Sequence, residues 1–331
     1  MSKLIISLSP HVHGGDSVER NMYNVLIALV PALLVSFYYF GLGSVVVCSV
    51  SVAACVFFEW AITRYMLRRP TTLLDGSACI TGLLLGMNLP SNFPIWMIIV
   101  GALVAIGIGK MTFGGLGCNP FNPAIVGRCF LLVSFPAAMT SWPVAGQQMA
   151  YTDAVTGATP LSLMKTAIKT GDVSVLQGLP DTVDMLLGNV ANGYGAGTIG
   201  EVCALALIAG LIWMLWRRVI TWHIPVTILA TVFVLSGALH AANPVYAHPM
   251  AVVLSGGLML GAIFMATDYV TSPMTHRGQV IYAVGIGVLT VVIRNWGSYP
   301  EGMSFAILIM NAFTPLINFY VKPKRFGEVS R

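Results

Sequence analysis

One polar segment of the sequence combines residue types that could bind a phosphate or form a phosphoester. Residues 153–161 read Asp-Ala-Val-Thr-Gly-Ala-Thr-Pro-Leu, so that small residues stand beside two threonine hydroxyls. Pro160 suits the first position of a helix, which predicts that Thr159 is the N-cap, where free backbone N–H groups favour a phosphate. An ordinary threonine cap without a ligand has the same pattern, so the spacing alone does not establish a cofactor site.

Four carboxylates lie in or beside apolar segments, where they could help to move an ion. A charged carboxylate at the bilayer centre costs at least ~2.5 kcal/mol on insertion scales, so such acids are candidates for an ion path. Glu59, close to Arg64, is interpreted as interfacial, and Glu201 suits the positive end of a helix. Asp75 and Asp268 remain as the two ion-path candidates, with structural pairing as the alternative.

The cysteines and histidines lack the spacing of a metal site. The six cysteines contain no Cys-x-x-Cys pair and most lie in apolar segments, which is typical of inert core thiols. His223, His240 and His248 do not converge. We therefore expect no metal ion. Lys110 could attract a phosphate or a quinone, but it is interpreted as a topology anchor.

The composition places all of these residues in a membrane protein. The 331 residues include only 17 Lys and Arg and 12 Asp and Glu, or 9%, and the mean hydropathy is +0.82. Soluble proteins carry about 25% charged residues, so a cytosolic enzyme, a nucleic-acid binder and a disordered chain are all disfavoured. We interpret the net charge of +5 as a topology signal rather than as a sign of an anionic partner.

Charge-free runs predict an all-α integral membrane protein with ten transmembrane helices. A helix needs about 20 apolar residues to cross the bilayer. Three runs are long enough for two helices each, and a turn signal divides each run. The run 21–58 is divided at residues 41–43, the run 76–109 at residues 90–94, and the run 219–267 at residues 240–248. The third helix is expected to start near residue 72 and to contain Asp75. Single spans are predicted over 121–138, 197–216, 277–293 and 302–321.

The basic residues predict that both termini are cytoplasmic. In that orientation thirteen Lys and Arg residues lie inside and three, Lys165, Lys169 and Arg294, lie outside, whereas Arg128 falls within the fifth span. The predicted segments are a cytoplasmic arm (1–20), helices one to five (21–138), an extracytoplasmic loop (139–196), helices six to ten (197–321) and a cytoplasmic tail (322–331). Within the loop, a short helix is expected around 161–170.

The two halves contain an internal repeat. Residues 82–86 match 257–261, Gly101 and Lys110 match Gly285 and Arg294, and 119–123 match 311–315. Five helices separate the copies, so the second half is inverted, as in folds that bind a solute or cofactor near the midplane. Chance matching of glycine and leucine is the alternative. The predicted architecture of two inverted five-helix repeats resembles that of urea transporters, which leaves a passive channel or transporter as a rival function.

Five segments resemble a single family. Residues 153–159 are similar to the flavinylation motif of the membrane subunits shared by the Rnf complex, a ferredoxin:NAD oxidoreductase, and the sodium-translocating NADH:quinone reductase. Further similar segments, in order along nearly the whole chain, are 117–127, 197–201, 220–225 and 264–273. The short N-terminal arm resembles that of the RnfD branch of the family more than that of the quinone-reductase branch. Tyr269 stands where the family usually has proline.

The resemblance implies a covalent flavin. In this family a dedicated flavin transferase attaches FMN through its phosphate to the last threonine of the motif, here Thr159, on the extracytoplasmic side. Asp153, Thr156, Gly157 and Ala158 match the rest of the motif. Relatives also hold a second, non-covalent flavin (riboflavin), to which no residue of this sequence points.

The resemblance also implies a redox-driven translocase of the bacterial cytoplasmic (inner) membrane. This chain is expected to be one subunit of it and not to be catalytic alone. It is expected to relay electrons between the ferredoxin and NAD side and a partner flavoprotein, coupled to Na+ or H+ translocation. The implied partners are membrane, iron–sulfur and flavoprotein subunits, the transferase and lipid, without nucleic acid. The alternatives are a urea-transporter-like passive channel or transporter and a scaffold.

Overall fold

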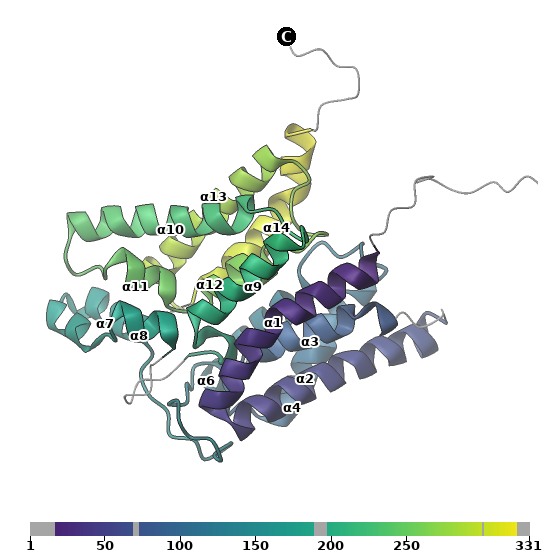
Figure 1. Ribbon diagram of the computed structural model, residues 1–331, viewed down its shortest axis with the longest axis horizontal. Helices are drawn as coiled ribbons and strands as arrows, with labels where there is room; N and C mark the ends of the chain where they lie inside the picture. The colour runs from purple at the N-terminus through teal and green to yellow at the C-terminus, as the bar shows by residue number, and fades with distance from the viewer. Residues whose placement is uncertain (1–16, 69–72, 189–196, 300, 323–331) are drawn as a thin grey trace, which may run out of the picture.

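The computed structural model describes residues 17–68, 73–188, 197–299 and 301–322. Within these ranges all regular structure is helical, apart from one isolated bridge between Pro143 and Thr156. Figure 1 shows the helices of the first half, coloured purple to blue, packed beside those of the second half, coloured green to yellow. Most of the predicted N-terminal arm and C-terminal tail lies outside the described residues.

The described part of the chain contains six helices that are long and apolar enough to cross a membrane. They are α1 (Val18–Phe40), α2 (Leu42–Ala61) with a π-helical extension to Met66, α4 (Ile95–Leu103) with extensions to Phe113, α10 (His223–Ala242), α13 (His276–Trp296) and α14 (Met303–Tyr320). The chain is thus a multi-pass membrane protein. Three more predicted spans correspond to shorter apolar helices, α3 (Ser77–Met87), α5 (Pro123–Ser134) and α9 (Ala204–Trp216).

The eighth predicted span is broken. It consists of α11 (Pro249–Leu254), α12 (Leu258–Leu260) and the π-helix Gly261–Met265. Gly256 lies at the break with φ +70°, and a Cβ built on it would lie 2.6 Å from Nη2 of Arg294. Glycine adopts this left-handed conformation without strain. Because the break falls inside an apolar run, the polarity pattern did not predict it.

The polar loop contains more helix than the sequence predicted. The helix α7 (Pro160–Thr170) occupies the expected position, whereas α8 (Thr182–Leu187) and the 3-10 helix Val173–Gly178 were not predicted. The helix α6 (Pro136–Met139) directly follows α5. The last part of the predicted loop, residues 189–196, lies outside the described residues.

Helix packing follows the same order in the two halves. The helix α2 packs against α3 and α4, and α10 packs against α11 and α13. Across the two halves, α1 packs against α9 and α5 packs against α14. Glycine permits the close contact between α2 and α3, because a Cβ on Gly82 would lie 2.6 Å from Cα of Val52. The chain turns between α1 and α2 at Gly41, where φ is +53°.

Candidate functional site

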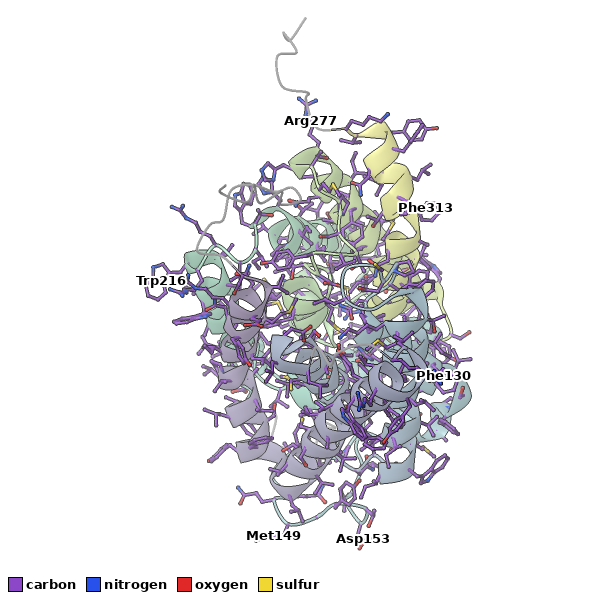
Figure 2. The ribbon with its side chains drawn as sticks, turned by 90° about the vertical axis from the view of Figure 1, so that its right-hand side faces the viewer. Phe130, Met149, Asp153, Trp216, Arg277 and Phe313 are labelled. Atoms are coloured by element: carbon purple, nitrogen blue, oxygen red, sulfur yellow. The ribbon has the colours of Figure 1, made fainter. Side chains whose placement is uncertain are left out.

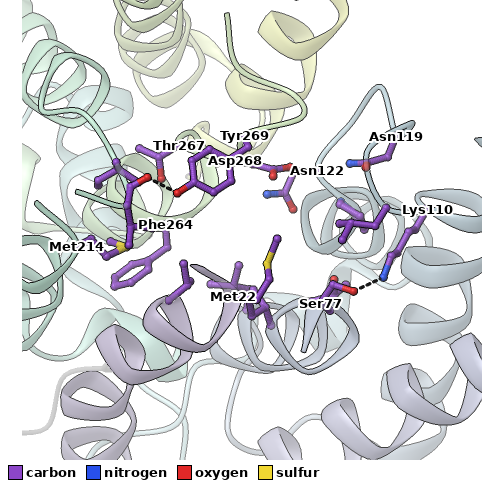
Figure 3. Close-up of a pocket in the computed structure, with 18 residues that line it drawn as sticks. Met22, Ser77, Lys110, Asn119, Asn122, Met214, Phe264, Thr267, Asp268 and Tyr269 are labelled. Carbon is purple, nitrogen blue, oxygen red and sulfur yellow. Dashed lines mark hydrogen bonds between the residues drawn. The ribbon is translucent and has the colours of Figure 1, made fainter. Parts of the chain in front are cut away.

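A pocket lies among the helices α1, α3 and α9 (Figure 3). The segment that follows α4 and the segment that follows the π-helix of the broken span complete its wall. Its empty volume, including the open mouth, is about 730 Å³. Its apolar wall includes Met22, Met214 and Phe264. Its polar lining residues are Ser77, Thr81, Lys110, Asn119, Asn122, Thr267, Asp268 and Tyr269.

A buried ion pair stands beside this pocket. The Lys110 ammonium lies 2.6 Å from Oε2 of Glu59, and the two side chains are 2% and 1% exposed. Lys110 also donates to the Ser77 hydroxyl at 2.7 Å, as Figure 3 shows. The Ser77 hydroxyl and backbone N–H donate in turn to Oδ1 of Asp75 at 2.7 and 3.0 Å. A hydrogen-bonded chain therefore connects Glu59 to Asp75.

These contacts correct two sequence interpretations. Glu59 is not interfacial, because it is buried and pairs with Lys110 inside the bundle. The topological role of Lys110 stays a prediction. Asp75 does not lie in the third helix, since it ends the short 3-10 turn Leu73–Asp75 and Gly76 adopts φ +75° before α3 begins. The sequence does carry one signal for this ion pair, because Glu59 and Lys110, with opposite charges, each directly follow a charge-free apolar run.

Asp268 reaches the pocket from the second half of the chain. It follows the π-helix Gly261–Met265 and accepts a hydrogen bond from the Thr271 hydroxyl at 3.3 Å. Asn122 caps the start of α5 and donates from Nδ2 to the Met265 carbonyl at 3.2 Å. Asn122 thus fixes the end of the π-helix that precedes Asp268.

Tyr269, at the position where the resembled family usually has proline, links two segments of the pocket wall. Its hydroxyl donates to the carbonyl of Val219 in the turn between α9 and α10. Tyr269 and Val219 both line the pocket, and Figure 3 shows this contact beside Met214. The tyrosine therefore connects the loop after the broken span to the α9–α10 turn.

Thr159 is the N-cap of α7, as the sequence predicted. Its Oγ1 accepts a hydrogen bond from the Ser162 N–H at 3.2 Å. Within the same motif Asp153, Thr156 and Ala158 are exposed. In contrast, the Thr159 side chain is only 5% exposed. The motif therefore presents most of its side chains to the surroundings but covers the threonine to which a phosphate would be attached.

The predicted site residues form two separate groups. Figure 2 shows Asp153 at one end of the molecule and Arg277, which follows Asp268 closely in the sequence, at the other end. Asp268 lines the pocket, and Asp75 is connected to it through Ser77. The structure therefore associates the two ion-path candidates with one pocket and leaves the threonine motif apart from them.

A further buried cation, Arg128, forms an ion pair that the sequence did not predict. Its guanidinium is 2% exposed and pairs with Glu301, just before α14. It also donates to Oδ1 of Asn88 at 2.7 Å and to the hydroxyl of Ser304 at 2.8 Å. The fifth predicted span therefore carries a charge that is neutralised inside the bundle.

No group of three His, Cys, Asp or Glu side chains within the described ranges is arranged to hold a metal ion. All six cysteines are free.

Comparisons with known proteins cover almost the whole chain. A family model described as the NQR2, RnfD, RnfE family matches residues 5–327. The D subunit of the sodium-translocating ferredoxin:NAD+ oxidoreductase complex of Acetobacterium woodii is 44% identical, over 98% of this chain and 95% of that protein. Its proton-translocating counterpart from Clostridium ljungdahlii is 40% identical (97% and 96% covered), and the D subunit of an ion-translocating oxidoreductase complex of Stutzerimonas stutzeri is 38% identical (96% and 94% covered).

Proposed function

Because the chain belongs to the NQR2, RnfD, RnfE family, we propose that it is a membrane subunit of an ion-translocating ferredoxin:NAD+ oxidoreductase complex and carries FMN covalently on Thr159. In this proposal it relays electrons between the ferredoxin and NAD side of the complex and a partner flavoprotein. The electron transfer drives Na+ or H+ across the bacterial cytoplasmic membrane. The chain is not catalytic alone and works with membrane, iron–sulfur and flavoprotein subunits.

The position of Thr159 at the start of a helix supports a phosphoester there. The threonine oxygen lies at the start of an 11-residue helix, where backbone N–H groups favour a phosphate. The N–H of Gly157 donates to the Trp142 carbonyl, which fixes the backbone two residues before the attachment point. The exposed side chains of Asp153, Thr156 and Ala158 provide a surface for a flavin transferase to recognise.

The burial of Thr159 places a condition on attachment. A side chain that is 5% exposed cannot accept a phosphate without displacement of its neighbours. We therefore infer that the transferase acts before α7 has packed or during local opening of the motif. Once bound, the flavin supplies the electron transfer, and the protein contributes placement and electrostatics.

The attachment site can be tested with matched threonine variants. The protein is expressed together with its flavin transferase and separated on a denaturing gel. The wild type is expected to give a flavin-fluorescent band, as is Thr152→Val, which alters an exposed threonine just before the motif. Thr159→Val is expected to give none. Fluorescence that persists in Thr159→Val at the wild-type level would contradict the proposed attachment.

We assign the 730 Å³ pocket to the second, non-covalent flavin (riboflavin). An isoalloxazine ring has one apolar and one polar edge, and the pocket offers Met22, Met214 and Phe264 together with Asn119 and Asp268. The aromatic and methionine side chains can contact the ring, and the amide and carboxylate groups can bond its polar edge. Asn119→Leu is expected to lower the content of extractable flavin without changing the covalent band, and unchanged extractable flavin would contradict the assignment.

We propose that Asp268 and Asp75 belong to the ion path. Support comes from their positions, since Asp268 lines the pocket and Asp75 ends the hydrogen-bonded chain that begins at Glu59. Asp268→Asn and Asp75→Asn are expected to reduce coupled ion transport in reconstituted vesicles more than they reduce the content of covalent flavin. If both variants pump at the wild-type rate, the two carboxylates are structural.

We further propose ten membrane-spanning helices in two inverted repeats, with cytoplasmic termini and the Thr159 motif on the extracytoplasmic side. In the repeat alignment Ser77 corresponds to Val252 and Lys110 to Arg294. Lys110 donates to Ser77 at 2.7 Å, and Arg294 donates to the Val252 carbonyl at 2.8 Å, so corresponding positions meet in both halves. The matching α2–α4 and α10–α13 pairs further support this arrangement.

The inverted repeat by itself also suits a urea-transporter-like channel. The two functions differ in the Thr159 motif, for which a passive pore has no use. Liposomes that contain the isolated protein are expected to show no solute flux above that of empty liposomes. Rapid flux together with absence of covalent flavin would favour the channel.

A further inference from the structure

A second pocket lies among α7, α10 and α13, with an empty volume of about 450 Å³ including its mouth. The residues of α10 and α13 that line this pocket belong to the C-terminal turns of the two helices. The 730 Å³ pocket, in contrast, borders the turn before α10, at the other end of that helix. Apolar side chains form most of its wall: Leu161, Met164, Ile168, Leu239, Ala247, Val252 and Val291. Two cations, Lys165 and Arg294, line it, and none of the lining residues is acidic.

Both cations are buried and are held by backbone carbonyls. Arg294 is 5% exposed and donates to the carbonyls of Val252 and Ser255 at 2.8 and 2.9 Å, while its Nε has no hydrogen-bond partner. Lys165 is 8% exposed and donates to the Gly297 carbonyl at 2.6 Å. Among the described residues, neither has a carboxylate within ion-pair distance, and the buried Glu201 acts on Arg294 only from farther away. The pocket thus holds two positive charges without a direct counter-ion.

This arrangement differs from the other buried cations of the chain. Lys110 is paired with Glu59 and Arg128 with Glu301. A buried charge that lacks such a partner is costly, so its presence indicates an anion from outside the chain. Burial, with a smaller contribution from the neighbouring Lys169, lowers the pKa of the Lys165 ammonium, as expected for a desolvated cation without a counter-ion.

We propose that this pocket binds the phosphate headgroup of an anionic phospholipid. Arginine and lysine form strong charge-assisted hydrogen bonds with phosphate, and the apolar wall suits the start of an acyl chain. Trp296, in the last turn of α13, is 61% exposed, which is typical of a residue at the membrane surface where headgroups lie. The lipid would therefore neutralise Lys165 and Arg294 at the end of the bundle that carries α7.

The test compares two lipids on the full chain. Purified, delipidated protein in neutral detergent is titrated with phosphatidylglycerol or phosphatidylcholine, and the midpoint of thermal unfolding is followed. Phosphatidylglycerol is expected to raise the midpoint and phosphatidylcholine is not. A basic residue near anionic lipid contributes about 1 kcal/mol, so Lys165→Gln should need about fivefold more phosphatidylglycerol for the same shift. The exposed Lys169→Gln on the same helix should behave like the wild type.

Three outcomes would overturn the proposal: equal stabilisation by phosphatidylcholine, an unchanged titration for Lys165→Gln, or an equal loss for Lys169→Gln. Arg294→Gln is a supporting variant only, because Arg294 also holds the carbonyls of the broken span. The flavin phosphate is a different source of the same chemistry, so the titration is repeated with Thr159→Val. If phosphatidylglycerol stabilises only this variant, the flavin phosphate occupies the pocket and the lipid assignment is wrong.

Discussion

The buried pair of Glu59 and Lys110 allows a quantitative prediction. Both side chains are at most 2% exposed, and the ammonium lies 2.6 Å from the carboxylate. Glu59→Gln removes the negative charge and leaves Lys110 charged in a low-dielectric interior. Breaking a buried pair from one side costs about 3–5 kcal/mol, so we expect a loss of this size in the free energy of unfolding.

The double variant Glu59→Gln, Lys110→Met should recover most of this loss. It removes both charges and loses the hydrogen bond from Lys110 to Ser77, which costs about 1 kcal/mol. Lys110→Met alone leaves Glu59 unpaired and should also cost about 3–5 kcal/mol, so the double-mutant cycle should give a coupling free energy of at least about 5 kcal/mol. By contrast, Lys169→Met, which alters an exposed lysine of α7, should change stability by less than about 0.5 kcal/mol.

The measurement is an unfolding titration with SDS in mixed micelles, followed by tryptophan fluorescence. A single variant as stable as the wild type would show that the two charges do not depend on each other. A double variant as unstable as Glu59→Gln would refute the reasoning in another way, because the loss would then come from packing and not from an unpaired charge.

Three further variants test other contacts by the same titration. Gly82→Ala should cost about 1–3 kcal/mol, because the new Cβ would lie 2.6 Å from the backbone of α2, whereas Gly107→Ala, with its nearest contacts at 3.8 Å, should be nearly neutral. Asn122→Ala should cost about 1–3 kcal/mol through the lost cap of α5 and the lost bond to the π-helix, and an unchanged stability would show that neither contact matters. Glu301→Gln should cost about 3 kcal/mol by leaving Arg128 buried and unpaired, and a stable variant would argue against that ion pair.

Local sequence signals predicted several elements well. The break between the first two helices lies at Gly41, because a glycine that interrupts a charge-free run marks a turn. Thr159 caps α7 because a threonine followed by proline is a strong start signal that needs no tertiary information. In both places the determining interactions lie within a few residues of each other along the chain.

Features that depend on distant contacts could not be predicted in this way. The partner of Lys110 is 51 residues away in the sequence, and that of Arg128 lies in the other half of the chain. The break at Gly256 has a local turn signal in the Ser-Gly-Gly of residues 255–257, but the bond that Arg294 of α13 donates to the Ser255 carbonyl could not be read from the sequence. For each of these residues, tertiary packing determines the environment, and composition and periodicity do not.

Peptide mass spectrometry detects the covalent attachment of FMN to Thr159 at the residue itself. The protein is produced together with its flavin transferase and digested with trypsin, and the peptide that ends at Lys165 is analysed. We expect the mass of this peptide to be increased by FMN less one water, with fragment ions that place the addition on Thr159. An unmodified peptide from fully flavinylated protein, or an addition located on Thr156, would contradict it.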